Sequence, residues 1–256
     1  MIILDSGLGG LSVVRALRAQ AADMPVLYVA DTAGFPYGNR DYADINARAE
    51  RIVGALSSTM PNHPIVLACN TLSTLCLEPL RAAFSAAFVG TVPAIKTAAQ
   101  LSATRRFTLL ATPNTARSPY SNALIAQFAS DCVVDGVGAT NLAAMAEAMM
   151  LGAPIDDARL RAEIATAFFD DSRGKTDCVV LGCTHYPLIG ETLTRLAPWP
   201  VTWIDSSEAI ARRALSLPNT PPPRSVAYVT ATQDIARYRE LFMREGFADV
   251  ALLELS

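Results

Sequence analysis

The sequence predicts an α/β protein with mostly parallel sheets, and two features of the chain support this prediction. Short apolar runs that are typical of buried strands alternate with amphipathic stretches that are typical of helices. Hydrophobic residues make up 51% of the 256 residues and charged residues 18%, which is the composition of a globular protein. This length suits one large domain or two domains of roughly 100–150 residues each.

The predicted elements follow one another in a regular order. The strand-like runs are Ile2–Leu4, Val26–Ala30, Ile65–Ala68, Phe107–Leu110, Cys178–Leu181, Val201–Ile204 and Val226–Val229. The helix-like segments are Leu11–Ala22, Tyr42–Ser57, Asn122–Ala129, Asn141–Leu151, Asp157–Phe169, Ser207–Ser216 and Asp234–Glu245. The proline-rich stretch Leu217–Pro223 is a stiff, extended connector. About 30 residues follow it, which is too few for a domain, so we expect them to pack back onto an existing one.

Charge and hydropathy argue against several classes of function. The net charge is −3, with 21 basic and 24 acidic residues, so the chain lacks the basic footprint of a nucleic-acid-binding protein. The longest uncharged stretch, Ile52–Leu77, is interrupted by Pro61 and Pro64 and is therefore no membrane-spanning helix. Met1 is followed at once by apolar residues, without the basic region of a signal peptide. We therefore expect a cytoplasmic protein that binds neither membrane nor nucleic acid.

Two of the five cysteines occupy similar places in the sequence. Cys69 and Cys183 each follow a buried-type strand and one small residue, and each is followed by polar residues. The odd cysteine count and the absence of C-x-x-C argue against a disulfide framework, and only two histidines are available for a zinc site. The two cysteines are separated by roughly one α/β domain length. Two similar domains would therefore place one thiol on each side of a shared cleft.

The residues that directly follow strands are the candidates for a site, because ligands of parallel sheets bind beyond the carboxyl ends of the strands. A thiol with a pKa of about 8.5 needs a partner to act as a base near neutral pH. His185 lies two residues after Cys183, and Asp5 can approach Cys69 from a neighbouring strand end, so both are candidate proton partners. For the remaining cysteines, Cys76, Cys132 and Cys178, an inert structural position is the simpler interpretation.

Other strand ends carry polar groups with two interpretations each. The segment Asp5–Ser12 suits anion binding at a helix start or an ordinary strand–turn–helix connection. The turn Pro36–Gly38, after Asp31, offers backbone N–H groups and the phenol of Tyr37 to a ligand, or it is a plain turn. The hydroxyl-rich Thr112–Ser118 contributes to a site or caps a helix. Taken alone, Glu147 is most simply a solvated helix charge.

Taken together, these segments resemble the cofactor-independent glutamate racemases of the aspartate/glutamate racemase superfamily. The matching motifs are Asp5-Ser6-Gly7-Leu8-Gly9-Gly10-Leu11-Ser12, Asp31 with Pro36-Tyr37-Gly38, Ala68-Cys69-Asn70-Thr71, Thr112 with Thr115 and Ser118, and Gly182-Cys183-Thr184-His185-Tyr186-Pro187. The resemblance implies two pseudo-symmetric α/β domains with the active site between them. One would comprise residues 1–93 plus 206–256 and the other residues 94–205. Leu72, Ala111 and Tyr120 depart from the family's usual pattern.

The resemblance also implies an activity, namely interconversion of L- and D-glutamate without pyridoxal phosphate or metal, which supplies D-glutamate for bacterial peptidoglycan. By analogy Cys69 acts on D-glutamate with help from Asp5, and Cys183 acts on L-glutamate with help from His185. The implied substrate-binding residues are Asp5, Ser6, Tyr37, Gly38, Asn70, Thr71, Thr115, Thr184 and His185. Glu147 aligns with a family carboxylate near the cleft, and a homodimer is expected. The roles of Asp31 and Glu147 stay open.

Two kinds of alternative follow from the same residues. The chain could be a superfamily relative such as an aspartate racemase, a hydantoin racemase or an arylmalonate decarboxylase. Two cysteines argue against a one-cysteine decarboxylase, and Cys183-Thr184-His185 favours glutamate racemase. A non-catalytic amino-acid-binding protein would also suit two domains around a cleft. Binding alone does not require paired cysteines, so we favour the enzyme.

Overall fold

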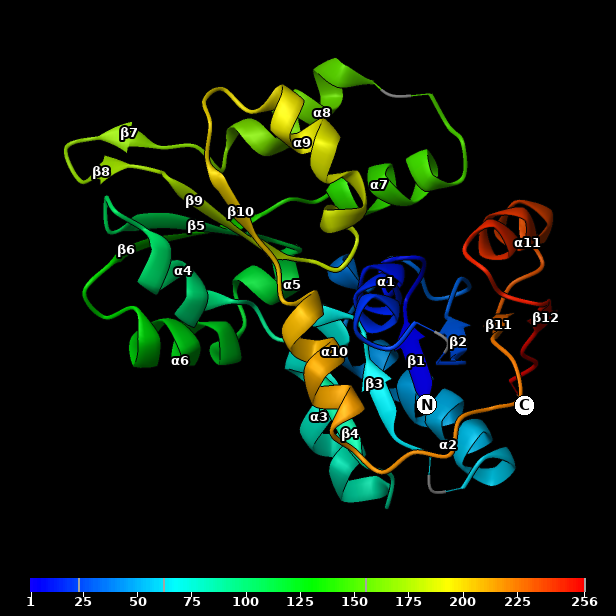
Figure 1. Ribbon diagram of the computed structural model, residues 1–256. Coiled ribbons are helices and arrows are strands. Elements are labelled where there is room, and N and C mark those ends of the chain that lie inside the picture. The colour runs from blue at the N-terminus through cyan, green and yellow to red at the C-terminus, as the bar shows by residue number, and fades with distance from the viewer. Residues whose placement is uncertain (23, 62, 155, 256) are drawn as a thin grey trace. The chain divides into compact units, whose positions relative to one another are not determined.

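The computed structural model describes residues 1–22, 24–61, 63–154 and 156–255 of the chain. The chain forms two compact units, one built from residues 1–91 and 207–256 and the other from residues 92–206. Each unit contains a parallel sheet with helices packed around it (Figure 1). The predicted α/β class with mostly parallel sheets is confirmed.

The first unit contains a six-stranded sheet in the order β12-β11-β2-β1-β3-β4, with every neighbouring pair parallel. Its strands are β1 (Ile2–Asp5), β2 (Leu27–Ala30), β3 (Ile65–Leu67), β4 (Phe88–Gly90), β11 (Val226–Val229) and β12 (Val250–Leu252). The central strands β1, β2 and β3 are buried along their whole length, which their unbroken apolar sequences explain. The C-terminal residues pack back onto this sheet, because β11 pairs with β2.

The helices of the first unit bury one apolar face each. They are α1 (Leu11–Gln20), η1 (Tyr37–Asn39), α2 (Tyr42–Thr59), α3 (Asn70–Ala83), α10 (Ser207–Leu215) and α11 (Ile235–Arg244). In α2 the buried residues recur every three or four positions, at Ile45, Ala49, Ile52, Val53 and Leu56. This face joins the side chains of β1, β2 and β3 in one hydrophobic core.

The second unit contains a four-stranded parallel sheet in the order β10-β9-β5-β6 and a separate antiparallel pair, β7 with β8. Its strands are β5 (Arg106–Ala111), β6 (Val133–Gly138), β7 (Asp170–Asp171), β8 (Gly174–Lys175), β9 (Cys178–Gly182) and β10 (Thr202–Ile204). Its helices are α4 (Ile95–Leu101), α5 (Pro113–Ala116), α6 (Pro119–Phe128), α7 (Leu142–Met150), α8 (Asp157–Ala165), η2 (Tyr186–Ile189) and α9 (Gly190–Leu196).

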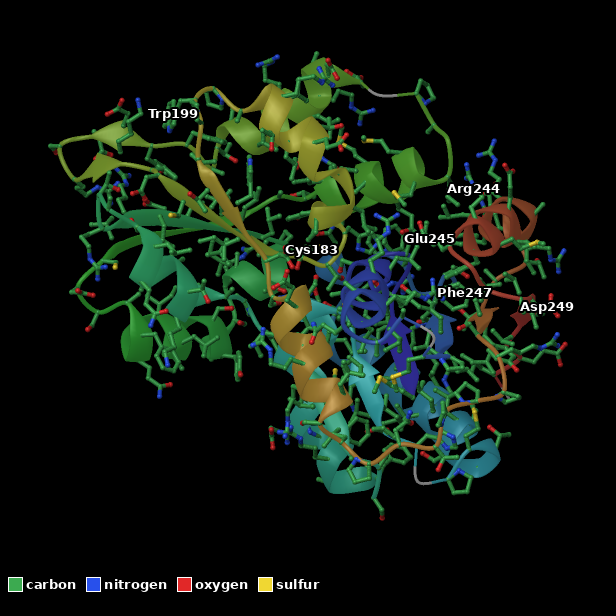
Figure 2. The ribbon with its side chains drawn as sticks, in the orientation of Figure 1. Cys183, Trp199, Arg244, Glu245, Phe247 and Asp249 are labelled. Atoms are coloured by element: carbon green, nitrogen blue, oxygen red, sulfur yellow. The ribbon has the colours of Figure 1, made fainter. Side chains whose placement is uncertain are left out.

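The two sheets share one strand order. In the first unit the order β2-β1-β3-β4 places the chain's first strand between the second and the third. The second unit repeats this order as β6-β5-β9-β10, when the β7–β8 hairpin is set aside. Cys69 follows β3, and Cys183, which is labelled in Figure 2, follows β9, so each cysteine follows the third strand of its own sheet. This agreement explains the local sequence similarity around the two cysteines.

Several elements were not predicted, and two predicted helices have an end that is three or more residues from the predicted one. Strands β4, β6, β7, β8 and β12 and helices α3, α4, α5 and α9 are additions to the predicted set. Helix α6 begins at Pro119, three residues before the predicted start, because Ser118 accepts a hydrogen bond from the Ser121 N–H and caps the helix there. Helix α8 ends at Ala165 rather than Phe169, and the chain then turns into β7.

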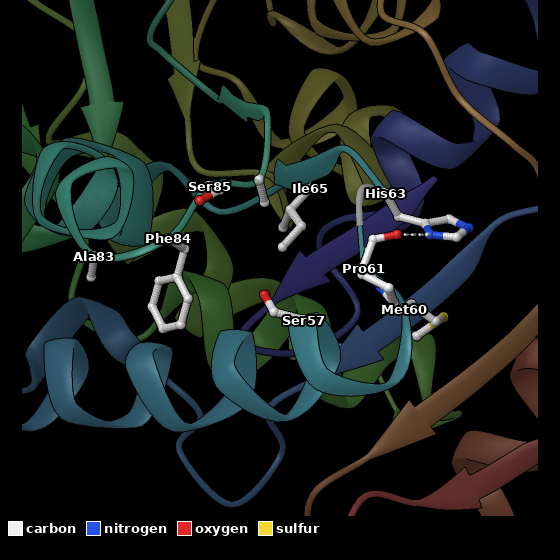
Figure 3. A pocket seen from close by; sticks show the side chains of 9 residues that line it. Ser57, Met60, Pro61, His63, Ile65, Ala83, Phe84 and Ser85 are labelled. Atoms are coloured by element: carbon white, nitrogen blue, oxygen red, sulfur yellow. Dashed lines mark hydrogen bonds between the residues drawn. The ribbon is translucent and has the colours of Figure 1, made fainter.

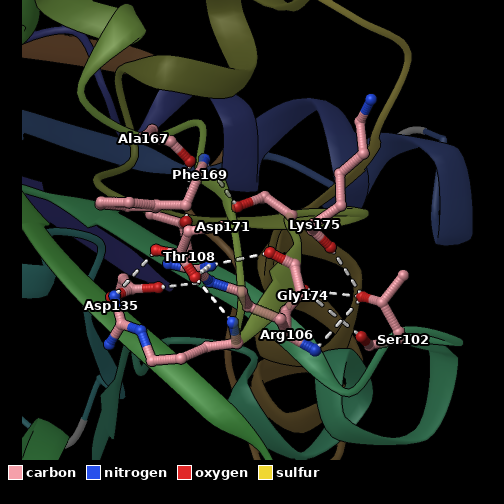
Figure 4. Close-up of polar contacts among 12 residues, drawn as sticks. Ser102, Arg106, Thr108, Asp135, Ala167, Phe169, Asp171, Gly174 and Lys175 are labelled. Atoms are coloured by element: carbon pink, nitrogen blue, oxygen red, sulfur yellow. Dashed lines mark hydrogen bonds and ion pairs between the residues drawn. The ribbon is translucent and has the colours of Figure 1, made fainter.

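An arginine anchors the second sheet at the amino end of its strands. Arg106, the first residue of β5, has a fully buried side chain. Its guanidinium pairs with Asp135 of β6 at 3.0 Å and with Asp171 of β7 at 2.6 Å (Figure 4). It also donates to the Gly174 carbonyl at 2.8 Å and lies 4.8 Å from the centre of the Phe169 ring. These contacts connect β5, β6 and the β7–β8 hairpin.

Candidate active site

The first candidate thiol lies at the start of a helix. Cys69 precedes α3 as its N-cap residue and is 6% exposed. The Ser6 hydroxyl, which follows β1, lies 3.9 Å from the Cys69 sulfur. The strand–turn–helix sequence thus places the Cys69 thiol at the carboxyl end of the sheet, next to the N-terminus of α3 and the Ser6 hydroxyl.

Asp5 ends the strand next to the one that leads to Cys69. The Ala68 N–H donates to the Leu4 carbonyl at 2.8 Å, so the two chain segments run together up to the site. Asp5 is fully buried, and its carboxylate accepts from the Gly7 N–H at 2.7 Å. This bond fixes the carboxylate in the turn that leads into α1. Asp5 is therefore a fixed, buried carboxylate at the end of the strand beside the one that leads to Cys69.

The two residues after Cys69 present polar groups at the first turn of α3. Asn70 and Thr71 are 3% and 2% exposed. Within the described part of the chain, the side-chain Nδ2 of Asn70 has no hydrogen-bond partner although it is buried. A buried donor without a partner is costly, and it is therefore a natural contact for a ligand acceptor such as a carboxylate. The geometry fits the substrate-binding role predicted for Asn70.

The turn after β2 holds Tyr37 and Gly38 in a buried position. The Tyr37 hydroxyl donates to Asp31 at 2.6 Å, and the Tyr37 side chain is 1% exposed. Burial and the negative charge of Asp31 raise the pKa of Tyr37 well above its ordinary value of 10.0. The phenol is therefore engaged by Asp31, and the backbone of Tyr37 and Gly38 becomes the better candidate for contact with a ligand.

The second candidate thiol lies beside a buried histidine–glutamate pair. The Cys183 sulfur is 3.8 Å from His185 Nδ1, and His185 Nε2 is 2.8 Å from a Glu147 carboxylate oxygen. Cys183, His185 and Glu147 are 6%, 2% and 4% exposed. Glu147 is on α7, but its side chain is buried and bonded to His185, so the interpretation of this residue as a solvated helix charge is wrong. The sequence separates Glu147 from His185 by 38 positions, and only the fold brings them together.

This pair controls the charge of the imidazole. Burial alone lowers the pKa of His185, but hydrogen bonds with Cys183 and Glu147 and attraction to both groups raise it well above 6.5. A carboxylate that accepts from one ring nitrogen fixes the orientation of the ring and stabilises its protonated form. The other ring nitrogen then faces the sulfur of Cys183. The arrangement can stabilise a thiolate and can relay a proton to it.

Thr184 and Tyr186 complete the polar surroundings of Cys183. Thr184 is 5% exposed, and Tyr186 is fully buried at the start of η2. The Tyr186 hydroxyl has no hydrogen-bond partner within the described residues. Sequence reasoning quoted Tyr186 as part of a motif without giving it a role. From the sequence alone, an aromatic residue at this position is simply expected in the hydrophobic core. The structure is needed to show that its buried hydroxyl has no partner among the described residues.

Thr115 is held by a chain of hydroxyl groups after β5. Thr112 caps α5 and donates from its Oγ1 to the Thr115 Oγ1 at 3.1 Å. Ser118 caps α6 and donates to Ser121 Oγ at 2.9 Å, and Ser121 in turn donates to the Thr115 carbonyl at 2.7 Å. Thr112 and Ser118 are therefore helix caps, and the hydrogen bonds that they make also fix the position of Thr115.

The predicted site residues thus form two groups, one in each unit. In the first unit, Asp5, Ser6, Tyr37, Gly38, Asn70 and Thr71 lie with Cys69 beyond the carboxyl ends of β1, β2 and β3. In the second unit, Thr115, Thr184 and His185 lie with Cys183 beyond β5 and β9. Each group contains one thiol, one candidate proton partner and further hydrogen-bonding residues.

The other cysteines occupy structural positions. Cys76 and Cys178 are 0% and 2% exposed and belong to hydrophobic clusters. Burial raises the pKa of Cys76 to about 12 and that of Cys178 to about 11, so both remain neutral thiols. Cys132 is partly buried. Among the described residues, these cysteines included, no group of three or more His, Cys, Asp or Glu side chains lies where it could hold a metal ion.

A cavity of about 290 Å³ lies in the first unit, away from Cys69. It is lined by residues such as Met60, Ile65 and Phe84, where α2 and α3 end (Figure 3). Ile65 begins β3, whereas Cys69 follows the other end of this strand. The cavity is therefore not the catalytic site.

The three departures from the family pattern lie in core or surface positions. Leu72 and Ala111 are fully buried in hydrophobic clusters, and Tyr120 is 41% exposed. None of them alters a polar residue of either group. No helix within the described residues is long and apolar enough to cross a membrane.

Comparison with known proteins identifies relatives over most of the chain. A family model described as Asp/Glu/Hydantoin racemase matches residues 8–214. The glutamate racemase of Brucella canis is 48% identical over 218 residues, which cover 85% of this chain and 79% of that protein. The glutamate racemase of Brucella ovis is 47% identical over the same shares of the two chains.

Solved structures agree with the sequence relatives. The structure of Escherichia coli glutamate racemase with L-glutamate and the activator UDP-MurNAc-ala matches with a TM-score of 0.92 and 35% identity, over 100% of this chain and 98% of that one. Glutamate racemase from Thermus thermophilus, in complex with β-chloro-D-alanine, matches with a TM-score of 0.72 and 28% identity, over 100% and 96% of the two chains.

Proposed function

This chain belongs to the Asp/Glu/hydantoin racemase family, and from that membership we propose that it is a glutamate racemase that works with two cysteine thiols. It is an amino-acid racemase, an isomerase. The observation that carries the two-thiol proposal is the equivalent position of Cys69 and Cys183, which lie two residues and one residue after the third strand of the 2-1-3-4 order that both sheets contain.

The choice of glutamate as the substrate is supported by the relatives. The curated relatives at 48% identity are glutamate racemases, and the similar Escherichia coli structure contains L-glutamate. We propose that the units 1–91 with 207–256 and 92–206 are the two domains of the enzyme and that glutamate binds between them. Asn70, Thr71 and Thr184 would donate to the substrate carboxylates, together with backbone groups of Tyr37 and Gly38.

The two thiols would act on opposite faces of Cα. With L-glutamate, the Cys183 thiolate removes the Cα proton and becomes a thiol, and the bonding electrons stay on Cα. The Cys69 thiol then donates its proton to the other face, which forms D-glutamate and leaves a Cys69 thiolate. The reverse reaction exchanges the two roles. Preorganised hydrogen-bond donors around the carboxylates stabilise the charge that develops in the transition state.

The proton partners keep each thiol in its reactive form. We propose that Asp5 assists Cys69 and that His185 assists Cys183. The protonated imidazole would stabilise the Cys183 thiolate, while Glu147 keeps the imidazole protonated across the hydrogen bond of 2.8 Å. Asp31 and Glu147 are then supporting residues rather than groups that contact the substrate.

The wider role follows from the product. We propose that the enzyme works without pyridoxal phosphate or metal and supplies D-glutamate for peptidoglycan synthesis in a bacterial cytoplasm. We also propose a homodimer, which size-exclusion chromatography with light scattering would measure directly.

Proton exchange at Cα is the decisive test. Purified protein is incubated with L-glutamate in heavy water with EDTA and without added cofactor, and optical activity and deuterium incorporation are followed together. A parallel reaction contains L-aspartate. Each reaction is repeated with UDP-MurNAc-ala, the activator in the Escherichia coli structure, so that a requirement for an activator is not mistaken for inactivity.

We expect loss of optical activity together with deuterium in the recovered glutamate. Faster racemisation of aspartate than of glutamate would assign the chain to the aspartate-specific branch of the family. Binding of glutamate without exchange, with and without the activator, would contradict the proposal and favour an amino-acid-binding protein.

A further inference from the structure

Four hydrogen bonds converge on the buried carboxylate of Asp31. Its Oδ2 accepts from the Tyr37 hydroxyl at 2.6 Å and from Arg48 Nε at 2.7 Å. Its Oδ1 accepts from Arg48 Nη2 at 2.5 Å and from the Thr230 hydroxyl at 2.6 Å. Burial raises the pKa of Asp31, but the bonds from Arg48, Thr230 and Tyr37 outweigh it and lower the pKa below 3.8. Asp31 is therefore a buried, ionised carboxylate to which three residues are bonded.

One of these donors comes from the far end of the chain. Thr230 follows β11 and is separated from Asp31 by 199 positions. Its hydroxyl also accepts from the Ala33 N–H at 3.0 Å. Next to it, the Ala231 N–H donates to the Thr32 hydroxyl at 3.0 Å. The C-terminal segment is therefore bonded to the first three residues of the turn that begins at Asp31.

This turn leads directly to the first thiol. Tyr37 belongs to the same hydrophobic cluster as Cys69, and η1 contacts α3, the helix that Cys69 caps. Gly34 lies against Asp31 and Arg48 so closely that a Cβ atom there would collide with both side chains. The turn therefore has one tightly packed arrangement, and Asp31 is at its centre.

We propose that Thr230 and Arg48 are positioning residues of the racemase, which act through Asp31 to hold Tyr37 and Gly38 in place beside Cys69. The C-terminal segment then contributes to substrate binding although it carries none of the family motifs. This inference rests on the proposed function for the identity of the substrate, but its geometry does not.

Substitutions that remove or keep the Thr230 hydroxyl distinguish a positioning role from a merely structural one. Pairing of β11 with β2 uses backbone groups, so a threonine at the strand end is not needed for the sheet. Valine has nearly the same shape and preserves the strand, but it cannot donate to Asp31 or accept from Ala33. Serine restores both bonds. Thr232 is exposed in the same segment and provides a matched control.

The first experiment measures steady-state racemisation of glutamate by wild type, Thr230→Val, Thr230→Ser and Thr232→Val. Because a hydrogen bond to a charged group is lost, we expect kcat/KM of Thr230→Val to fall roughly tenfold, mainly through KM. Thr230→Ser should recover most of the loss, and Thr232→Val should match wild type. A lower melting temperature of Thr230→Val with unchanged kinetics would overturn the proposal.

The second experiment does not require turnover. Alkylation of Cys69 by iodoacetamide is followed by peptide mass spectrometry, because Tyr37 packs in the cluster that covers Cys69. We expect Cys69 of Thr230→Val to react severalfold faster than that of wild type, Thr230→Ser and Thr232→Val. Equal rates in all four proteins would overturn the proposal. If wild type does not racemise glutamate, the proposed function fails and this second experiment still decides the inference.

Discussion

The two thiols occupy the same place in the topology but have different partners. Cys69 and Cys183 both follow the third strand of a 2-1-3-4 parallel sheet. Cys69 begins a 14-residue α-helix, whereas Cys183 leads into a short 3₁₀-helix beside a buried histidine and glutamate. The strand order thus places a thiol at the same point of each sheet, but the neighbouring groups differ. At Cys69 they are the N-terminus of α3 and the Ser6 hydroxyl, and at Cys183 they are His185 and its partner Glu147.

The largest expected effect comes from removing either thiol. Because net inversion uses one group as base and the other as acid, Cys69→Ser and Cys183→Ser should each lose racemisation in both directions. We expect about 10²–10⁴-fold lower kcat, the usual contribution of a general acid or base. Circular dichroism confirms the fold, and Cys132→Ser, which changes a partly buried cysteine outside both groups, is the control. Near-normal turnover by either variant contradicts the two-thiol mechanism.

The second prediction concerns Glu147→Gln, which removes the carboxylate that is bonded to His185 beside Cys183. Without the carboxylate, the raised pKa of His185 falls, so the imidazole loses its proton at a lower pH. The pH profile of kcat/KM for L-glutamate should therefore lose its alkaline side at lower pH than in wild type, with about a tenfold lower rate near pH 8. The variant Glu191→Gln, at an exposed position of α9, is the control.

The reverse reaction provides an internal check on this assignment. Removal of the D-glutamate proton is assigned to Cys69, whereas Glu147 is bonded to His185 beside Cys183. L- and D-glutamate have equal free energies, so kcat/KM is the same in both directions at every pH and the check uses kcat alone. The pH profile of kcat for D-glutamate should shift less than that for L-glutamate. Equal shifts in the two directions contradict the pairing of His185 with Cys183.

The short-range features of the site were predictable, and the long-range ones were not. Cys69, Asn70 and Thr71 follow a strand directly, so a strand prediction alone places them at a carboxyl end. The contacts Glu147–His185 and Thr230–Asp31 join residues that are 38 and 199 positions apart, and no local pattern indicates them.

The unpredicted strands of the two parallel sheets have a common physical reason. β4, β6 and β12 each lie at an edge of a sheet. An edge strand has a neighbour on one side only, and its sequence does not need an unbroken apolar run. β6, for example, is half-buried along most of its length and contains Asp135, Gly136 and Gly138. Among the helices, α3 begins with polar residues and contains Pro79, which hides its helical pattern.

The two ends of the second sheet provide a further contrast, between catalysis and stability. Arg106 is buried at the amino end of β5, and Asp135, its partner, has a side chain that is only 16% exposed. Arg106→Met removes the cation and leaves a partly buried carboxylate, so we expect a loss of about 3 kcal/mol in unfolding free energy. The kcat at 25 °C should stay close to that of wild type, because Arg106 is remote from the carboxyl ends of the strands.

Urea unfolding of Arg106→Met and Arg173→Met measures this effect. Arg173 contacts the same two carboxylates, at 3.3 Å from Asp171 and 3.7 Å from Asp135, but its side chain is 55% exposed. A solvated pair contributes about 1 kcal/mol or less, so Arg173→Met should be nearly as stable as wild type. Equal losses in the two variants would show that burial of Arg106 does not matter.

The smallest expected effect is the pH dependence of the Arg106–Asp171 pair. The hydrogen bond from Arg106 holds the pKa of Asp171 at about 2, below its ordinary value of 3.8. A lowered pKa in the folded state stabilises the protein above the unfolded pKa, and this contribution is lost as the pH falls from about 4 toward 2. The Asp171 side chain is 43% exposed, which keeps the effect small.

The urea midpoint of wild type should therefore exceed that of Asp171→Asn at pH 6, and the difference should shrink at pH 3. In an Arg106→Met background the pH dependence of the same substitution should be weaker, because the largest of the interactions that lower the pKa is gone while the bonds from Arg173 remain. A difference that stays constant from pH 6 to pH 3 would mean that Asp171 stabilises the hairpin through shape rather than charge.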